Sequence, residues 1–287
     1  MSPAVVVPAV TTVERSAEGN EEAGAVRNNH RRAVRLCLVP GMAIGAIIGV
    51  VLAAVGLPVY VAAVVFVVVA AAVMTVLWQR APGAVLRAVG ARPSHEADRP
   101  RLHNLVDGLC ATMGLPQPSI CVVDSPVPNA MAVGRDPGSA TLVVTSALDH
   151  SLTLVELEGV LAHELVHIKR HDTVLAAVAV SVSAPLSLFT GVPRAAERVH
   201  SRVGSGREFA ADQRAAAVVR YPAGIGSALA AMLDGPDRSA PWPPGRGRTA
   251  ALTRWLWIDP MVGTPSSLSM EGNLDDTRVR AEAQTLY

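Results

Sequence analysis

The chain has 287 residues, of which 50% are apolar and only 17% are charged, and its formal net charge is +1. This composition is unusual for a soluble protein, and the near-neutral charge gives no reason to expect nucleic-acid binding. Aromatic residues are 3%, so the apolar mass is Ala, Val and Leu, and the length suffices for one medium domain plus membrane segments.

Two features bear on the compartment in which the chain folds. Residues 1–33 are polar and are predicted to be a disordered cytoplasmic tail. They do not resemble a signal peptide, because both the polar stretch and the apolar stretch after it are too long. The three cysteines, Cys37, Cys110 and Cys121, are too few and too scattered for a disulfide framework. A reducing compartment fits, and pairing of Cys110 with Cys121 stays open.

From Val34 to Trp78 the chain is almost wholly apolar, interrupted only by Gly56-Leu57-Pro58. Each half has about twenty residues, enough for one bilayer crossing, so residues 34–80 are predicted to form a transmembrane hairpin. Glycines at four-residue spacing in the first half either allow close helix approach or merely reflect a Gly-rich helix: Gly41, Gly45 and Gly49. Arginines precede and follow the hairpin, so the positive-inside rule places both ends, and the soluble domain, in the cytoplasm.

The predicted soluble domain covers residues 95–287. A helical stripe from Leu102 to Met113 comes first, and three short strands follow at residues 119–124, 129–134 and 140–145. We expect a small antiparallel sheet with residues 129–134 at its edge. Because an edge strand can pair with an extended peptide, this strand supplies the candidate substrate-binding residues: Asn129, Ala130, Met131 and Ala132.

A second helix is predicted after the sheet. Thr153 and Glu156 have capping-box spacing, and apolar residues then recur at three- and four-residue steps. The segment H-E-L-V-H lies inside this helix, and residues four apart share one face, so His163 and His167 can bind one ion. Glu164 is rotated by one position and can reach a water on that ion, which makes it the candidate catalytic base.

The third ligand is sought downstream. A third histidine at metzincin spacing is absent, because Arg170 and Thr173 occupy the positions that this pattern needs. Glu208 lies on a plausible helix with Asp212 one turn further along the same face. Glu208 suits a metal ligand, and Asp212 suits a carboxylate that hydrogen-bonds a ligand histidine. The set predicts a zinc site of the Glu-liganded kind, with one Zn²⁺ per chain.

The apolar run from Thr173 to Val192 is long enough for another crossing. A single crossing would separate Glu208 from His163 and His167, so that one zinc ion could not bind all three. The run is therefore either buried in protein or a broken hairpin that dips in and out near Pro185, and a dead metal site is the third possibility. We favour a hydrophobic helical hairpin within residues 173–192, packed on, or partly in, the inner leaflet.

The C-terminal part carries weaker signals. Gly224 to Leu233 is predicted to be a helix, residues 234–248 a mobile Pro/Gly/Arg loop, and Leu274 to Leu286 a polar terminal helix. Trp255 and Trp257 either belong to the core, which we favour, or anchor the chain at a membrane interface.

Four linked motifs resemble those of the HtpX-type membrane zinc metallopeptidases, whose family also contains the CAAX prenyl endopeptidases and the Oma-type mitochondrial proteases: residues 129–134, 145–148, 156–172 and 207–212. The resemblance covers about residues 95–235. It implies His163, His167 and Glu208 as ligands, Glu164 as base and Asp212 as the supporting aspartate. Asp172 matches an aspartate whose role is expected to be structural.

The chain also departs from that pattern. HtpX-type chains place two membrane segments between the zinc helix and the Glu helix, whereas this chain has one interrupted run. Of the C-terminal His-Pro-Pro and Arg-Ile signature only Arg278 and an aliphatic residue remain, and whether Arg278 lines the cleft stays open.

The sequence thus predicts an α+β, mainly helical gluzincin-type domain with a small antiparallel sheet behind a transmembrane hairpin. The expected function is a membrane-anchored zinc endopeptidase with protein or peptide substrates and membrane lipid as partners, and quality control is one expected setting. Two alternatives are kept: a silent or latent peptide-binding membrane protein, and a signalling peptidase of the sensor-transducer type. The oligomeric state stays open.

Overall fold

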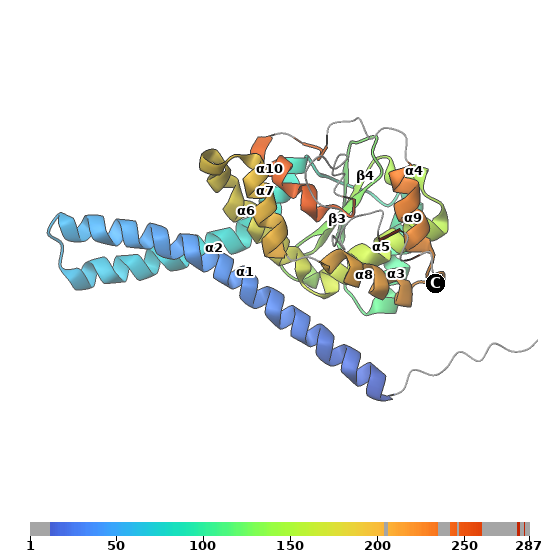
Figure 1. Cartoon of the computed structure of the whole chain (residues 1–287), viewed down its shortest axis with the longest axis horizontal. Coiled ribbons are helices and arrows are strands. Elements are labelled where there is room, and N and C mark those ends of the chain that lie inside the picture. Colours follow the sequence, from blue (N-terminus) through green and yellow to red (C-terminus); the bar gives the residue numbers. More distant parts are fainter. Residues whose placement is uncertain are drawn as a thin grey trace, which may run out of the picture.

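The computed structural model describes residues 12–203, 206–234, 242–245, 247–259, 280–281 and 284. A long helical hairpin projects from a globular part in which helices surround a small sheet (Figure 1). The three cysteines are all free thiols.

The hairpin consists of α1 (Thr12–Ala54) and α2 (Val59–Val89), joined by a turn in which Gly56 has a φ of 88°. Both helices are long and apolar enough to cross a membrane. A Cβ atom added at Gly41 would lie 2.7 Å from the Ala70 carbonyl oxygen, and one at Gly45 the same distance from that of Phe66. The glycine face is therefore an interhelical contact, which only residues without a side chain permit.

The prediction of a disordered tail is wrong for residues 12–33, which form the first part of α1. This stretch is held against the globular part by side chains that lie far away in the sequence. Glu22 lies 3.4 Å from the Lys169 ammonium group, and the Asn29 amide donates to the Arg170 carbonyl oxygen at 3.1 Å. Composition alone favoured disorder because it contains no information on these tertiary partners.

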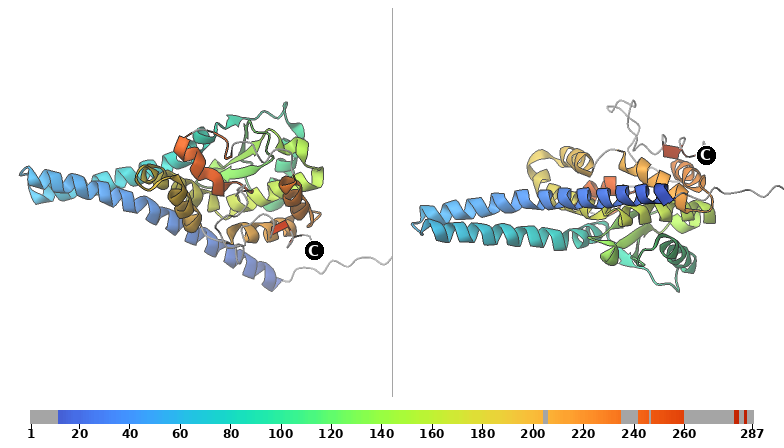
Figure 2. Two further views of the ribbon diagram at one scale, coloured as in Figure 1. Left: turned by 45° about the horizontal axis from the view of Figure 1, so that its top comes forward. Right: turned by 90° about the horizontal axis from the view of Figure 1, so that it is seen from below.

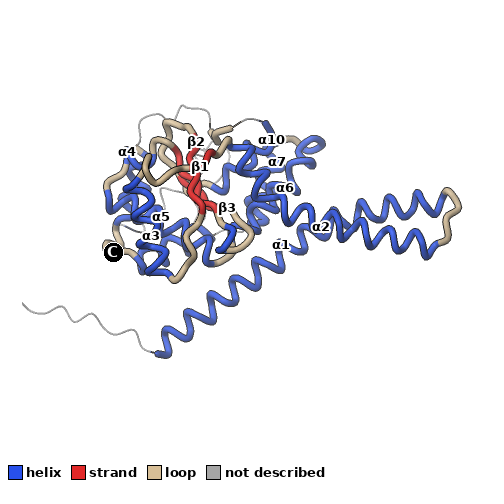
Figure 3. Tube along the Cα trace, turned by 180° about the vertical axis from the view of Figure 1, so that it is seen from behind, coloured by secondary structure: helices blue, strands red, loops and turns tan. Residues whose placement is uncertain are grey.

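The sheet has four strands, β1 (Arg92–Pro93), β2 (Ser119–Val123), β3 (Ala130–Val133) and β4 (Thr141–Thr145), in the order β1-β2-β4-β3. Figure 3 shows the strands in red among the helices. It is mixed rather than purely antiparallel, because β4 inserts between β2 and β3 and runs parallel to β2. β3 lies at the edge, as predicted.

Every residue of β3 and β4 is buried, and because successive strand residues point to opposite sides, both faces of this part of the sheet are covered. Ala130 and Ala132 of β3 belong to one core and Met131 and Val133 to a second. The first core contains residues of α3 (Pro100–Met113), α4 (Leu148–Ser151), α5 (Leu154–Lys169), α8 (Arg207–Val218) and α9 (Gly224–Leu233). The second contains residues of α6 (Asp172–Thr190), α7 (Val192–Val203), α10 (Gly247–Leu252) and the 3-10 helix η2 (Thr253–Leu256). A short 3-10 helix, η1 (Pro137–Ser139), precedes β4.

The apolar run after α5 forms α6, which continues through Pro185 without a break. Gly191, with a φ of 78°, ends α6, and α7 turns back toward the globular part. The first half of α6 is buried, whereas Leu186, Leu188 and Phe189 near its end are exposed, Phe189 to 88%. The prediction of a hairpin within residues 173–192 is therefore wrong, because a single helix covers this run and the chain reverses only at Gly191. The reversal between α6 and α7 keeps Glu208 on the same side as the α5 histidines.

The C-terminal predictions are settled in part. α9 has the predicted bounds, and Trp257 is a core residue that is 1% exposed. Most of the loop 234–248 and of the segment 274–286 lies outside the described residues, and so does Arg278.

Candidate metal centre

Local interactions fix the start of α5. The Thr153 backbone N–H donates to the Glu156 carboxylate at 2.8 Å, and the Glu156 N–H donates back to the Thr153 hydroxyl oxygen at 3.4 Å. This capping box satisfies two amide donors that no helical carbonyl can reach. Gly159 lets α9 approach closely, since an added Cβ atom would lie 2.8 Å from the Ile225 backbone nitrogen. The helix therefore holds its histidines in a fixed frame.

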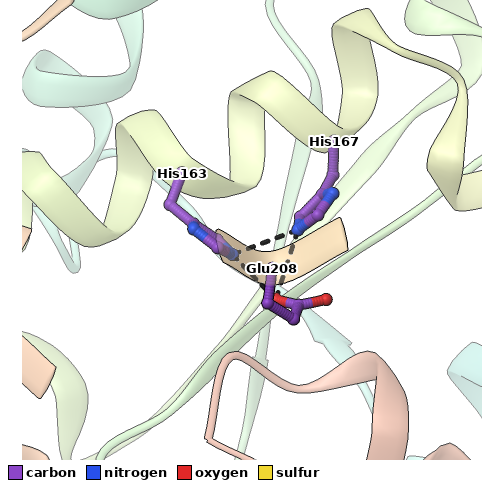
Figure 4. A group of neighbouring side chains, drawn as sticks. All are labelled: His163, His167 and Glu208. Atoms are coloured by element: carbon purple, nitrogen blue, oxygen red, sulfur yellow. Dashed lines mark hydrogen bonds and ion pairs between the residues drawn. The ribbon is translucent and has the colours of Figure 1, made fainter. Parts of the chain in front are cut away.

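Three donor atoms from two helices meet in this frame. His163 and His167 project from α5 toward Glu208 on α8 (Figure 4). The Nε2 atoms of the two histidines are 3.1 Å apart. Oε2 of Glu208 lies 3.0 Å from Nε2 of His163 and 3.4 Å from Nε2 of His167. All three residues are buried. They form a group that could hold a metal ion.

A carboxylate lies beside the other ring nitrogen of each histidine. Nδ1 of His163 is 2.8 Å from Oδ1 of Asp212, and Nδ1 of His167 is 2.9 Å from Oδ2 of Asp172. When the imidazole ring is neutral, a carboxylate at Nδ1 favours the tautomer in which Nε2 carries the free lone pair. Asp172 is close because His171, with a φ of 57°, turns the chain in a single residue between α5 and α6.

The charges around Glu208 keep it ionised. Burial alone raises the pKa of Glu208, but Arg207 and both histidines outweigh this effect and hold the pKa well below its usual value. The Arg207 guanidinium contacts Oε1 of Glu208, which leaves Oε2 facing the histidines. Burial lowers the pKa of His167, but the Glu208 carboxylate and the hydrogen bonds that His167 donates to Asp172 and Glu208 raise it to about 9.

Glu164 lies next to these groups on α5 and is 1% exposed. Its Oε1 atom has no hydrogen-bond partner among the residues described. Burial raises the pKa of this carboxyl group, and the two histidines counteract the rise only in part. A raised pKa suits a group that must take up and release a proton near neutral pH.

The donor set fits zinc. Two imidazole nitrogens and one carboxylate oxygen are typical ligands of a catalytic zinc ion that keeps a fourth position open. With metal–ligand bonds of about 2.0–2.1 Å, tetrahedral ligands lie about 3.3 Å apart, close to the spacing of the three donor atoms. The carboxylates at both Nδ1 atoms match the outer shell that such histidines usually have.

The predicted substrate residues lie on the edge strand, but they are not open side chains. Residues 129–132 are all buried. The Asn129 side-chain amide donates to the Asp259 carbonyl oxygen at 2.7 Å, and the Ile258 N–H donates to the Ala130 carbonyl oxygen at 2.9 Å. The chain's own backbone thus occupies part of the edge.

Three residues around the site were missed or undervalued by sequence reasoning. Arg280 holds Asp212, Asn29 holds Asp172, and Asp172 contacts a candidate ligand rather than having only a structural role. Asp172 had a usable signal, because it follows His167 by five residues. Asn29 and Arg280 have no local pattern that distinguishes them.

Comparison with known proteins agrees with this geometry. Residues 96–255 match peptidase family M48. Curated relatives described as protease HtpX homologs come from Salinibacter ruber (36% identity over 169 residues), Acidiphilium cryptum (34% over 210) and Tropheryma whipplei (35% over 199). The matches cover 52%, 63% and 59% of this chain and 61%, 72% and 66% of those relatives, so the chain spans about two thirds of their length. With the family match covering more than half of its residues, the chain belongs to peptidase family M48, as a member of the HtpX type.

Proposed function

We propose that this chain is a membrane-anchored zinc endopeptidase that hydrolyses peptide bonds of protein or peptide substrates. The observation that carries the proposal is the meeting of His163, His167 and Glu208 beside the buried carboxyl group of Glu164. His163, His167 and Glu208 are the proposed ligands, and Asp212 is proposed to orient His163.

When bound at such a site, zinc polarises a scissile carbonyl group and lowers the pKa of a water molecule to about 7. Glu164 accepts the proton of the attacking water as its oxygen bonds to the carbonyl carbon. Glu164 then donates this proton to the leaving nitrogen as the C–N bond breaks. The raised pKa of Glu164 supports both steps, because a strongly acidic carboxyl group would be a poor acceptor and would bind no proton to return.

Substrate is proposed to pair with the outer edge of β3. The Asn129 carbonyl oxygen accepts from the Thr145 N–H, and the Asn129 N–H donates to the Thr145 hydroxyl oxygen, so the backbone groups of Ala130 and Ala132 point away from β4. An extended peptide can add to this edge through main-chain hydrogen bonds, which bind the substrate backbone with little sequence preference.

The membrane placement is proposed from the apolar helices and the arginines. Residues 34–80 span the bilayer as a hairpin, and the peptidase domain, residues 95–287, lies on the cytoplasmic side. In Figures 1 and 2 the turn between α6 and α7 lies on the side from which the hairpin projects. The exposed Leu186, Leu188 and Phe189 therefore suit contact with the inner leaflet.

The test is zinc content together with casein cleavage, for detergent-purified wild type and Glu164→Gln. The proposal predicts zinc in both proteins and cleavage only by wild type, because glutamine keeps the shape of the side chain but cannot carry the proton. Absence of zinc from both would refute the metal centre, and equal cleavage by both would refute Glu164 as the base.

One observation favours a second candidate, a latent form of the same enzyme. The Ile258 N–H donates to the Ala130 carbonyl oxygen, and the Asn129 side-chain amide donates to the Asp259 carbonyl oxygen. The Arg280 guanidinium donates to the Ile258 carbonyl oxygen at 2.6 Å. A substrate strand would compete with this segment for the Ala130 carbonyl oxygen. Ile258→Pro removes the competing donor, so a latent enzyme would gain casein cleavage, whereas a constitutive one would not.

A further inference from the structure

We propose that Asn29, in the part of α1 that precedes the membrane-spanning stretch, is a positioning residue for His167 and acts through Asp172. The inference rests on the proposed function, because it takes His167 as a metal ligand. It assigns to the anchoring helix a direct part in the geometry of the metal centre.

The Asn29 side chain is buried against the end of α5, with 7% exposure. Its Nδ2 atom lies 2.5 Å from Oδ1 of Asp172 and 3.1 Å from the Arg170 carbonyl oxygen. An amide nitrogen has two N–H donors, and this geometry uses both. One donor fixes the backbone at the end of α5, and the other fixes the carboxylate that follows it.

The two oxygens of Asp172 have separate tasks. Oδ1 accepts from Asn29, and Oδ2 lies 2.9 Å from Nδ1 of His167. Arg170 lies farther from this carboxylate, with its Nε atom 3.8 Å from Oδ2. Asn29 therefore holds the oxygen that His167 leaves open, and it restrains rotation of the carboxylate without adding a charge. A carboxylate with restricted rotation holds the imidazole ring in one orientation.

The same stretch of α1 contacts both helices that carry candidate ligands. Glu22 lies 3.4 Å from Lys169 at the end of α5, and Glu21 lies 3.1 Å from Arg214 on α8. Glu21 is 73% exposed, and exposed ion pairs contribute little stability. The buried amide of Asn29 is thus the contact through which this stretch of α1 reaches the carboxylate of Asp172, and the following turns of α1 are packed into the second core by Ala33 and Cys37.

The continuity of α1 makes this contact consequential. α1 runs without a break from the docked stretch into the hairpin (Figure 2). The side chain that holds Asp172 therefore belongs to the helix that anchors the chain.

The test compares Asn29→Ala with Asn28→Ala in the full-length chain. Asn28 is the exposed neighbour on the same helix and makes a matched control. Zinc affinity is measured by competition with a chelator, and the ligand field by the visible absorption of the Co²⁺-substituted protein. Loss of a residue that supports a metal ligand lowers metal affinity about 10–100-fold. We therefore expect Asn29→Ala to lower zinc affinity about 10-fold and to change the visible absorption band of the Co²⁺-substituted protein. Asn28→Ala should match wild type.

A double-substitution cycle separates positioning from general destabilisation. If Asn29 acts through Asp172, zinc binding by the Asn29→Ala/Asp172→Ala protein is no weaker than by Asp172→Ala alone. Asn29→Asp keeps the size of the side chain but places a like charge beside Asp172, and it should weaken zinc binding at least as much as alanine. The inference would be overturned if the losses of zinc affinity in the two single variants multiplied in the double variant. It would also be overturned if Asn29→Ala had the zinc affinity and the Co²⁺ spectrum of the wild type.

The outcome for the wild type separates this inference from the proposed function. A wild type that binds zinc and cleaves casein through Glu164, together with an unaffected Asn29→Ala, overturns only the role of Asn29. A wild type that binds no zinc overturns both.

Discussion

The Arg280 guanidinium holds both carboxylate oxygens of Asp212: Nε lies 2.7 Å from Oδ2, and Nη2 lies 2.8 Å from Oδ1. Both residues are 0% exposed. Burial alone raises the pKa of Asp212, but Arg280 and the contact with His163 outweigh it and lower the pKa. Asp212 is thus kept as an anion, in the form that can fix Nδ1–H of His163.

Arg280→Ala is expected to weaken both folding and metal binding, because it leaves the Asp212 carboxylate buried without its cation. Breaking a buried ion pair in this way costs about 3–5 kcal/mol. Thermal melting with and without zinc measures both effects. Arg280→Lys keeps the charge but loses the two-point contact, so its melting temperature should lie between those of alanine and wild type. A wild-type melting curve for Arg280→Ala would contradict the prediction.

Zinc binding is expected to weaken as the pH falls. With a pKa of about 9 for His167, metal must displace a proton throughout the neutral range. Below that pKa, each decrease of one pH unit should lower zinc affinity about tenfold, or by about 1.4 kcal/mol. Glu208, with its lowered pKa, stays ionised and adds no proton of its own.

Chelator competition between roughly pH 6 and pH 8 measures this slope. Asp172→Asn is the informative variant, because the hydrogen bond that His167 donates to the Asp172 carboxylate raises the pKa of His167. With a neutral acceptor in place of the carboxylate the pKa is lower, so the weakening should begin at a lower pH. An affinity that does not change with pH in wild type would show that His167 is already unprotonated.

Substrate pairing at β3 is tested by Ala132→Pro. Proline removes a backbone N–H that points to the outer edge, and proline is tolerated at such edge positions. One lost hydrogen bond of about 0.5–1.5 kcal/mol should lower kcat/KM for casein roughly 2- to 10-fold. Zinc content should not change, because Ala132 is not among the ligands. Unchanged kcat/KM in the folded variant would mean that substrate does not use this edge.

Close packing of the hairpin is tested by Gly45→Ala and Gly49→Ala. A Cβ atom at Gly45 would lie 2.7 Å from the Phe66 carbonyl oxygen, whereas one at Gly49 would have its nearest neighbour at 3.4 Å. Overpacking costs about 1–3 kcal/mol, so Gly45→Ala should lower the melting temperature in detergent. Gly49→Ala should be neutral or stabilising, because alanine favours helix. Equal melting temperatures for the two variants would contradict the close approach.

The sequence by itself determined the features that depend on local geometry. The capping box at Thr153 and the helical repeat place His163 and His167 on one face, because residues four apart on a helix lie on the same side. The length and apolarity of the first two helices likewise predict a membrane-spanning hairpin, because these properties can be read from the sequence without knowing the tertiary partners of the helices.

Only the tertiary structure decided how distant segments meet. Asn29 contacts Asp172 across 143 positions, and Arg280 contacts Asp212 across 68. Neither contact leaves a periodic trace in the sequence, which is why residues 12–33 were predicted to be disordered and why Arg280 was overlooked. The mixed sheet depended on the insertion of β4 beside β2, and the meeting of Glu208 with the histidines depended on the turn at Gly191. Periodicity reports which face of an element is apolar, but only packing decides which element covers that face.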